Sequence, residues 1–142
     1  MGHLGQTHAR LYQELADAEL VGVADVNAKR AEKIAALQGC EPFTDFELLL
    51  PKVQAVSVVV PTPLHEKIGL ACLRAGVHCL IEKPLATTVE EAERLHNLAE
   101  SRRVILQVGH VERFNPAVQE AQRHITDPRF IQAVRLGPYD PR

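Results

Sequence analysis

Four short runs of almost uninterrupted apolar residues constrain this sequence more than any other feature. They span Leu20–Ala24, Ala55–Val60, Val77–Ile81 and Val104–Val108. A half-exposed antiparallel strand alternates apolar and polar residues, whereas a strand that is buried on both faces is apolar along its length. The runs therefore predict a parallel sheet that is covered by helices on both faces.

The segments between these runs carry signals for helix ends. Asn27 precedes a helical segment that stops near Gly39, and Thr88 opens a capping-box pattern with Glu91. Asn115 is followed by proline, which is a common pair at the start of a helix. Strand and helix alternate along the chain, so we expect an α/β doubly wound fold with a Rossmann-like parallel sheet.

The length of 142 residues predicts one domain and the beginning of another. We expect the first domain to span residues 1–126 and a second α/β domain to begin within residues 127–142. Residues 130–136 are rich in β-formers and predict the first strand of that second domain.

Composition excludes several classes of protein. No apolar run approaches the roughly 18 residues that cross a bilayer. The 16 basic and 18 acidic residues give a net charge of −2, which argues against binding to nucleic acid or to a membrane surface. The three cysteines and seven histidines lack the spacings of disulfide frameworks and metal sites. We expect a cytoplasmic protein with free thiols and no bound metal.

The first residues match part of a phosphate-binding loop. Gly2 and Gly5, with His3 and Leu4 between them, correspond to the second and third glycines of G-x-G-x-x-G at the start of a helical segment. Such a loop lets the backbone approach a pyrophosphate, which the N–H groups of the helix then bind. The first glycine and its strand would precede residue 1, so we expect the sheet of this chain to lack its first strand.

Asp25 stands at the end of the first apolar run, about 20 residues after Gly5, where dinucleotide-binding folds carry an acidic residue. A carboxylate there accepts hydrogen bonds from the ribose hydroxyls and repels a 2′-phosphate, so it predicts NAD rather than NADP. The alternative is a helix-capping or turn residue. Lys29 and Arg30 follow closely and would either weaken the preference for NAD or form the solvated face of a helix.

Further motifs occur in a fixed order along the chain. Glu82-Lys83-Pro84 follows the third apolar run, and the others are G-H-L-G-Q-T-H-A-R at residues 2–10, P-T-P-L-H at residues 61–65 and V-G-H-V-E-R-F-N-P at residues 108–116. Together they resemble the Gfo/Idh/MocA family of NAD(P)-dependent oxidoreductases. The spelling of the motifs is most similar to a bacterial branch that oxidises nucleotide sugars.

The resemblance implies roles for individual residues. Thr62, Pro63 and His65 would lie beside the cofactor, and Glu82 would contact the nicotinamide ribose. Lys83 is the catalytic candidate, because its ammonium group can bind the reacting oxygen and stabilise negative charge while hydride leaves a carbinol carbon.

The resemblance also leaves questions open. His110 and Arg113 would either border the substrate pocket or cap strand and helix ends. The acid–base pair of the family's substrate domain is absent, so we expect the 142 residues alone to be inactive and the full-length enzyme to be a homo-oligomer. The alternatives are a dehydrogenase of free sugars or cyclic polyols, and a non-catalytic NAD-binding sensor.

Overall fold

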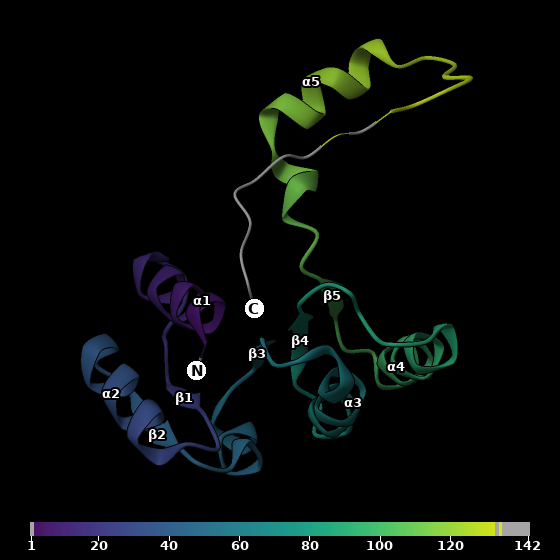
Figure 1. Ribbon diagram of the computed structural model, residues 1–142. Coiled ribbons are helices and arrows are strands. Elements are labelled where there is room, and N and C mark those ends of the chain that lie inside the picture. The colour runs from purple at the N-terminus through teal and green to yellow at the C-terminus, as the bar shows by residue number, and fades with distance from the viewer. Residues whose placement is uncertain (1, 133, 135–142) are drawn as a thin grey trace. The chain divides into compact units, whose positions relative to one another are not determined.

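The computed structural model describes residues 2–132 and 134, and the chain divides into two units, Met1–His110 and Val111–Arg142. The first unit alternates strands and helices in the order expected of an α/β fold (Figure 1). Its elements are α1 (His3–Glu14), β1 (Gly22–Ala24), α2 (Ala28–Gln38), β2 (Glu41–Phe43), β3 (Ala55–Val58), α3 (His65–Arg74), β4 (His78–Ile81), α4 (Val89–Arg102) and β5 (Leu106–Val108).

The strands form two parallel sheets. One pairs β1 with β2, and the other has the order β3-β4-β5. In the larger sheet Val58, Ile81 and Val108 lie side by side in register, so the three strands end at one edge. The predicted α/β class with parallel strands is confirmed.

A cavity of about 470 Å³ separates the two sheets. One wall consists of α1 and residues 17–24, and the other consists of residues 46–60 together with Ile68 and Cys72. Among the described residues no strand pairs with the inner edge of β1 or of β3. The gap lies where the doubly wound strand order puts the first strand of the sheet.

Each sheet has its own hydrophobic core. The smaller core has four buried residues, which come from α1, β1 and α2: Ala9, Val23, Ile34 and Ala35. The larger core lies between the three-stranded sheet and helices α3 and α4, and its nine buried residues are Leu50, Val58, Cys72, Leu73, Val77, Cys79, Ile81, Leu95 and Ala99.

Three of the predicted helix ends are formed as expected. The side chain of Asn27 accepts the Arg30 N–H, and Gly39 ends α2 with a left-handed φ of 65°. Thr88 caps α4 by accepting the Glu91 N–H. The capping box differs in one respect, because the Glu91 carboxylate bonds to Thr87 instead of to the Thr88 N–H.

The second unit contains a 3-10 turn (Val111–Phe114) and the helix α5 (Pro116–His124), which Asn115 caps as predicted. Of the predicted strand over residues 130–136, residues 130–132 and 134 have no regular secondary structure, and the others lie outside the described residues. The proposed boundary at residue 126 stays a prediction. No described helix has both the length and the apolar character that a membrane span requires.

Candidate functional site

The N-terminus of α1 is suited to an anion. Gly2 is its N-cap in extended conformation, no side chain caps the first turn, and that turn carries no acidic residue. The space around Gly2 is open, since a Cβ there would meet no atom within 4 Å. His3 and Leu4 are exposed in the first turn, whereas Gly5 is buried. The helix therefore presents its N-terminal N–H groups and the positive end of its dipole to solvent.

Asp25 lies at the carboxyl end of β1, where its N–H donates to the Phe43 carbonyl at 3.0 Å. Its carboxylate accepts the Asn27 N–H at 2.8 Å and a guanidinium N–H of Arg30 at 3.1 Å. The side chain is only 8% exposed. Asp25 is thus also the turn residue of the alternative interpretation, and Arg30 pairs directly with it.

The loop after β3 is held from within by a buried histidine. His65 is 1% exposed, and its Nδ1 and Nε2 lie 2.8 Å and 2.9 Å from the carbonyl oxygens of Pro84 and Val60. The ring joins the loop after β3 to the loop after β4, which makes it a residue that positions these loops. Thr62 is half-buried and Pro63 is exposed in the 3-10 turn that opens this loop.

Glu82 and Lys83 directly follow β4. The Glu82 N–H donates to the Val58 carbonyl at 3.1 Å, and the Glu82 carboxylate accepts the Lys83 N–H at 3.2 Å. Glu82 is 7% exposed, whereas Lys83 is exposed. The Lys83–Pro84 peptide bond is cis. Within residues 2–132 no ion pair holds the Lys83 ammonium group, so it can bind a ligand oxygen.

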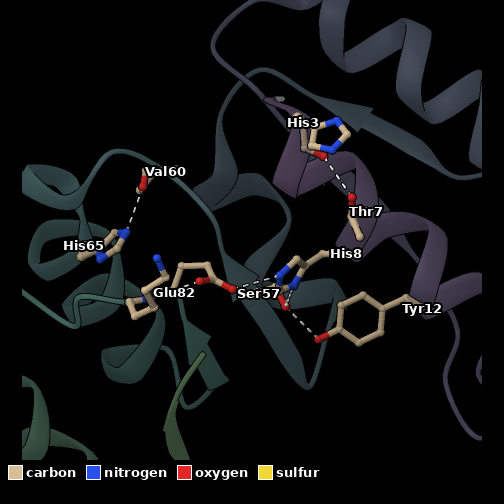
Figure 2. A network of polar contacts seen from close by, with 9 residues as sticks. His3, Thr7, His8, Tyr12, Ser57, Val60, His65 and Glu82 are labelled. Atoms are coloured by element: carbon tan, nitrogen blue, oxygen red, sulfur yellow. Dashed lines mark hydrogen bonds and ion pairs between the residues drawn. The ribbon is translucent and has the colours of Figure 1, made fainter. Parts of the chain in front are cut away.

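Helix α1 contacts Ser57 in β3 and Glu82 after β4 through a network of polar side chains (Figure 2). His8 Nε2 lies 3.2 Å from Glu82 Oε1, and His8 Nδ1 lies 3.1 Å from Ser57 Oγ. The Tyr12 hydroxyl lies 3.0 Å from the same Ser57 oxygen. The network connects α1, which follows the glycine loop, to Glu82, the first residue after β4.

Gly109 lies against the Glu82 carboxylate. Its N–H donates to the Ile81 carbonyl at 2.8 Å, and a Cβ at this position would lie 2.7 Å from Glu82 Oε1. The motif V-G-H therefore contains a glycine because the Glu82 carboxylate occupies the space of a side chain.

The two candidate substrate residues fall in different units. His110 is the exposed last residue of the first unit. Arg113 is exposed in the second unit, where its carbonyl accepts the Gln119 side chain at 3.1 Å. Their roles toward a substrate stay predictions. Among the described residues no three His, Cys, Asp or Glu side chains are grouped to hold a metal ion.

Sequence reasoning missed four residues of this site: His8, Tyr12, Ser57 and Gly109. One signal was available, because Ser57 is the single polar residue in the apolar run A-V-S-V-V-V. A hydroxyl inside a buried strand needs a hydrogen-bond partner, and here His8 and Tyr12 meet that need.

Comparison with known proteins gives a consistent result. Residues 1–110 match the family GFO_IDH_MocA, described as an oxidoreductase family with an NAD-binding Rossmann fold. The chain is 43% identical over 143 aligned positions to a UDP-N-acetylglucosamine 3-dehydrogenase of Acidithiobacillus ferrooxidans. It is 35% identical over 129 positions to a scyllo-inositol 2-dehydrogenase (NAD(+)) of Bacillus subtilis. These alignments cover 100% and 88% of this chain, but only 45% and 38% of the relatives.

Solved structures agree with the sequence relatives. The Acidithiobacillus ferrooxidans enzyme superimposes with a TM-score of 0.81 over 87% of this chain and 40% of its own. A 3-ketoreductase from Actinomadura kijaniata, in complex with NADP and TDP-benzene, superimposes with a TM-score of 0.78 at 29% identity, over 82% of this chain and 37% of its own.

Proposed function

The chain belongs to the Gfo/Idh/MocA oxidoreductases with an NAD-binding Rossmann fold, and from this premise we propose that it supplies the cofactor site of a nucleotide-sugar dehydrogenase. The observation that carries the proposal is that Asp25, Glu82 and Lys83 directly follow the carboxyl ends of parallel strands β1 and β4. Ligands of open parallel sheets bind outside these ends.

The residues present fit a dinucleotide. The uncapped first turn of α1 at Gly2 and Gly5 would hold the pyrophosphate, because it offers N–H groups and no acidic side chain. Asp25 would accept hydrogen bonds from the adenosine ribose. We assign NAD as the preferred cofactor, since a 2′-phosphate next to the Asp25 carboxylate would be repelled.

Lys83 would act at the reacting oxygen of the substrate. A bound nicotinamide would supply the acceptor for the hydride of the carbinol carbon. The exposed ammonium of Lys83 would stabilise the negative charge on the substrate oxygen while the hydroxyl proton passes to the acid–base pair of the substrate domain. The buried Glu82 carboxylate, which lies directly before Lys83, would bind ribose hydroxyls on the nicotinamide side of the cofactor.

The substrate class rests on the relatives. The alignment with the UDP-N-acetylglucosamine 3-dehydrogenase extends over the full chain at 43% identity, which favours a nucleotide sugar. The 35% identity with the scyllo-inositol 2-dehydrogenase supports a cyclic polyol as the second candidate.

The test grafts this chain into the Acidithiobacillus ferrooxidans enzyme in place of the segment that it matches, and then changes Lys83 to Ala. Loss of a charged donor to the transition state costs about 3–4 kcal/mol, so kcat should fall by roughly 10²–10³ while the Kd for NADH stays nearly constant. Lys67→Ala, which removes an exposed lysine of α3, is the control. A Lys83→Ala enzyme within about threefold of the parent kcat would contradict the proposed role.

A further inference from the structure

Two hydrogen-bonding contacts and one packing feature hold the Glu82 carboxylate in place. His8 Nε2 contacts its Oε1 at 3.2 Å, the Lys83 N–H donates to its Oε2 at 3.2 Å, and Gly109 leaves the space that the carboxylate fills. The side chains of His8 and Glu82 are only 16% and 9% exposed. A buried polar contact of this kind has few alternative partners, so its geometry depends on the residues that form it.

The network has one consistent direction of hydrogen bonding. An ionised carboxylate only accepts hydrogen bonds, so His8 Nε2 donates to Glu82. In a neutral imidazole Nδ1 then accepts, and its donor is the Ser57 hydroxyl. The Ser57 oxygen in turn accepts from the Tyr12 hydroxyl. The Glu82 carboxylate thereby selects the Nε2–H tautomer of His8, and Ser57 and Tyr12 complete the hydrogen bonds of the ring.

The chain offers a comparison inside the same molecule. His124 and Glu120 make the same type of contact, with Nε2 and Oε1 at 3.1 Å, but on an exposed helix face where the side chains are 76% and 57% exposed. Water competes for such a contact, and it is worth little. The difference in burial therefore separates a contact that positions a residue from one that does not.

From these contacts we infer that His8 is a positioning residue: through the Glu82 carboxylate it fixes the main chain at Lys83 and thus the direction of the Lys83 ammonium group. The inference rests on the proposed function for the role of Lys83, but the positioning itself is a property of this fold. His8 touches neither cofactor nor substrate in this role. Tyr12 and Ser57 support it by orienting the imidazole ring.

Two substitutions disturb the Glu82 carboxylate in different ways. His8→Ala removes the donor to the carboxylate, whereas Gly109→Ala adds a methyl group that pushes the carboxylate away from its position. Because that group is the end of a flexible side chain, Gly109→Ala should leave the fold intact. His8→Gln keeps an N–H donor, and Tyr12→Phe removes a single hydroxyl.

The first measurement is hydrogen exchange at the Lys83 amide in the grafted enzyme, which reports positioning without any reference to turnover. We expect exchange to accelerate at least about fivefold in His8→Ala and in Gly109→Ala, because the acceptor of that amide is displaced. His124→Ala should leave the rate unchanged. Unchanged exchange in both variants would overturn the inference.

The second measurement is turnover in the same protein. A displacement of about 1 Å at a catalytic group costs up to about 100-fold, so His8→Ala and Gly109→Ala should each lower kcat by about 10- to 100-fold. The KM for NADH should rise as well, because the displaced Glu82 carboxylate is the proposed ligand of the ribose hydroxyls. His8→Gln should recover part of the loss, and Tyr12→Phe should cost less than His8→Ala. The double variant should be no slower than the worse single variant, since both act on one carboxylate.

The outcomes separate the two proposals. Losses that add in the double variant would mean that His8 and Gly109 act independently, which overturns the inference. If Lys83→Ala leaves kcat unchanged while His8→Ala still speeds exchange at the Lys83 amide, the proposed function fails and the positioning stands.

Discussion

The two sheets of the first unit differ in how completely they are built. The half formed by β3-β4-β5 with α3 and α4, the three-stranded half, buries nine core residues, including Ile81 and Leu95 at 0% exposure. The half formed by β1-β2 with α1 and α2, the two-stranded half, buries four. Two-stranded sheets have little stability of their own in water, whereas three strands packed on helices can be stable. The comparison predicts that the two-stranded half is the less stable of the two and gains most from a strand placed in the cavity between the sheets.

The halves also divide the proposed chemistry. The three-stranded half carries Glu82 and Lys83 at the end of β4, whereas the two-stranded half carries the glycine loop and Asp25. Substitutions at Lys83 should therefore change turnover, whereas substitutions at the glycine loop and at Asp25 should change cofactor affinity and choice. His8 is the exception, because it lies on α1 and contacts Glu82.

The largest expected effect comes from filling the cavity. About eight apolar, strand-forming residues placed before Gly2 can pair with the inner edges of β1 and β3, which no described strand pairs with. We expect the 142 residues alone to be poorly soluble or to melt without cooperativity. The extended chain should melt cooperatively and gain NADH binding, as measured by calorimetry and fluorescence titration.

The control for this extension carries prolines at alternate positions of the added segment, which removes its N–H donors. It should behave like the unextended chain. A sharp thermal transition together with micromolar NADH affinity in the unextended chain would break the comparison between the halves.

The second prediction uses the free cysteines, which are divided between the halves. Cys40 is half-buried in the two-stranded half, where burial raises its pKa. Cys72 and Cys79 lie fully inside the core of the three-stranded half. The neighbouring Cys79 thiol lowers the pKa of Cys72, and the Cys72 thiol, followed by burial, raises the pKa of Cys79.

Alkylation followed residue by residue with mass spectrometry should therefore report the stability of each half. If opening of the larger core costs about 3 kcal/mol, Cys72 and Cys79 should react roughly 100-fold more slowly than Cys40. In denaturant all three should react at similar rates, which is the control. Equal rates in the folded chain would mean that the halves open together.

The sequence predicted the larger features of the fold because these follow from continuous apolar runs and local caps. The four apolar runs all contain strands, and Asn27, Thr88 and Asn115 cap the predicted helices. The strand predicted over residues 130–136 has no regular structure in its described residues. The strand β2 was missed, since its three residues Glu41–Phe43 include a proline and form no apolar run. Its position as an edge strand tolerates both features.

The site was predictable only in part. The motifs identified Glu82 and Lys83, but the contact between His8 and Glu82 joins residues that are 74 positions apart in the sequence. Such a contact depends on how α1 packs beside the sheet, which periodicity does not encode. His65 illustrates the opposite case, because its motif is distinctive while the structure buries its ring against two carbonyl oxygens.

A third and smaller effect concerns cofactor choice in the two-stranded half. Asp25→Ala removes the carboxylate that would repel a 2′-phosphate and releases Arg30 from its ion pair. In the grafted enzyme the preference for NADH over NADPH should narrow by about tenfold, which corresponds to about 1.4 kcal/mol. Fluorescence titration with both cofactors measures it, and Glu32→Ala on the exposed face of α2 is the charge-matched control. Tighter binding of NADPH by the unaltered protein would contradict the assignment of NAD.

The smallest expected effect is a pH dependence at the start of α4, which covers the three-stranded half. The hydroxyl of Thr87, followed by its N–H, holds the pKa of the exposed Glu91 carboxyl below its usual value. A depressed pKa in the folded state means that the ionised group stabilises the fold above the unfolded value of about 4.3, and that this stabilisation is lost as the pH falls through the folded pKa.

Glu91→Gln should therefore lower Tm slightly near pH 7, and the difference in Tm from the unaltered chain should vanish at strongly acidic pH. Glu93→Gln makes the same charge change two positions further along the helix without removing a contact to Thr87, and it is the control. Absolute alkylation rates fall with pH because the reactive thiolates become protonated. If the acid effect belongs to the three-stranded half, the alkylation rate of Cys72 and Cys79 relative to that of Cys40 should therefore rise less on acidification in Glu91→Gln than in the unaltered chain. A difference in Tm that persists unchanged to low pH would mean that Glu91 stabilises α4 without its charge.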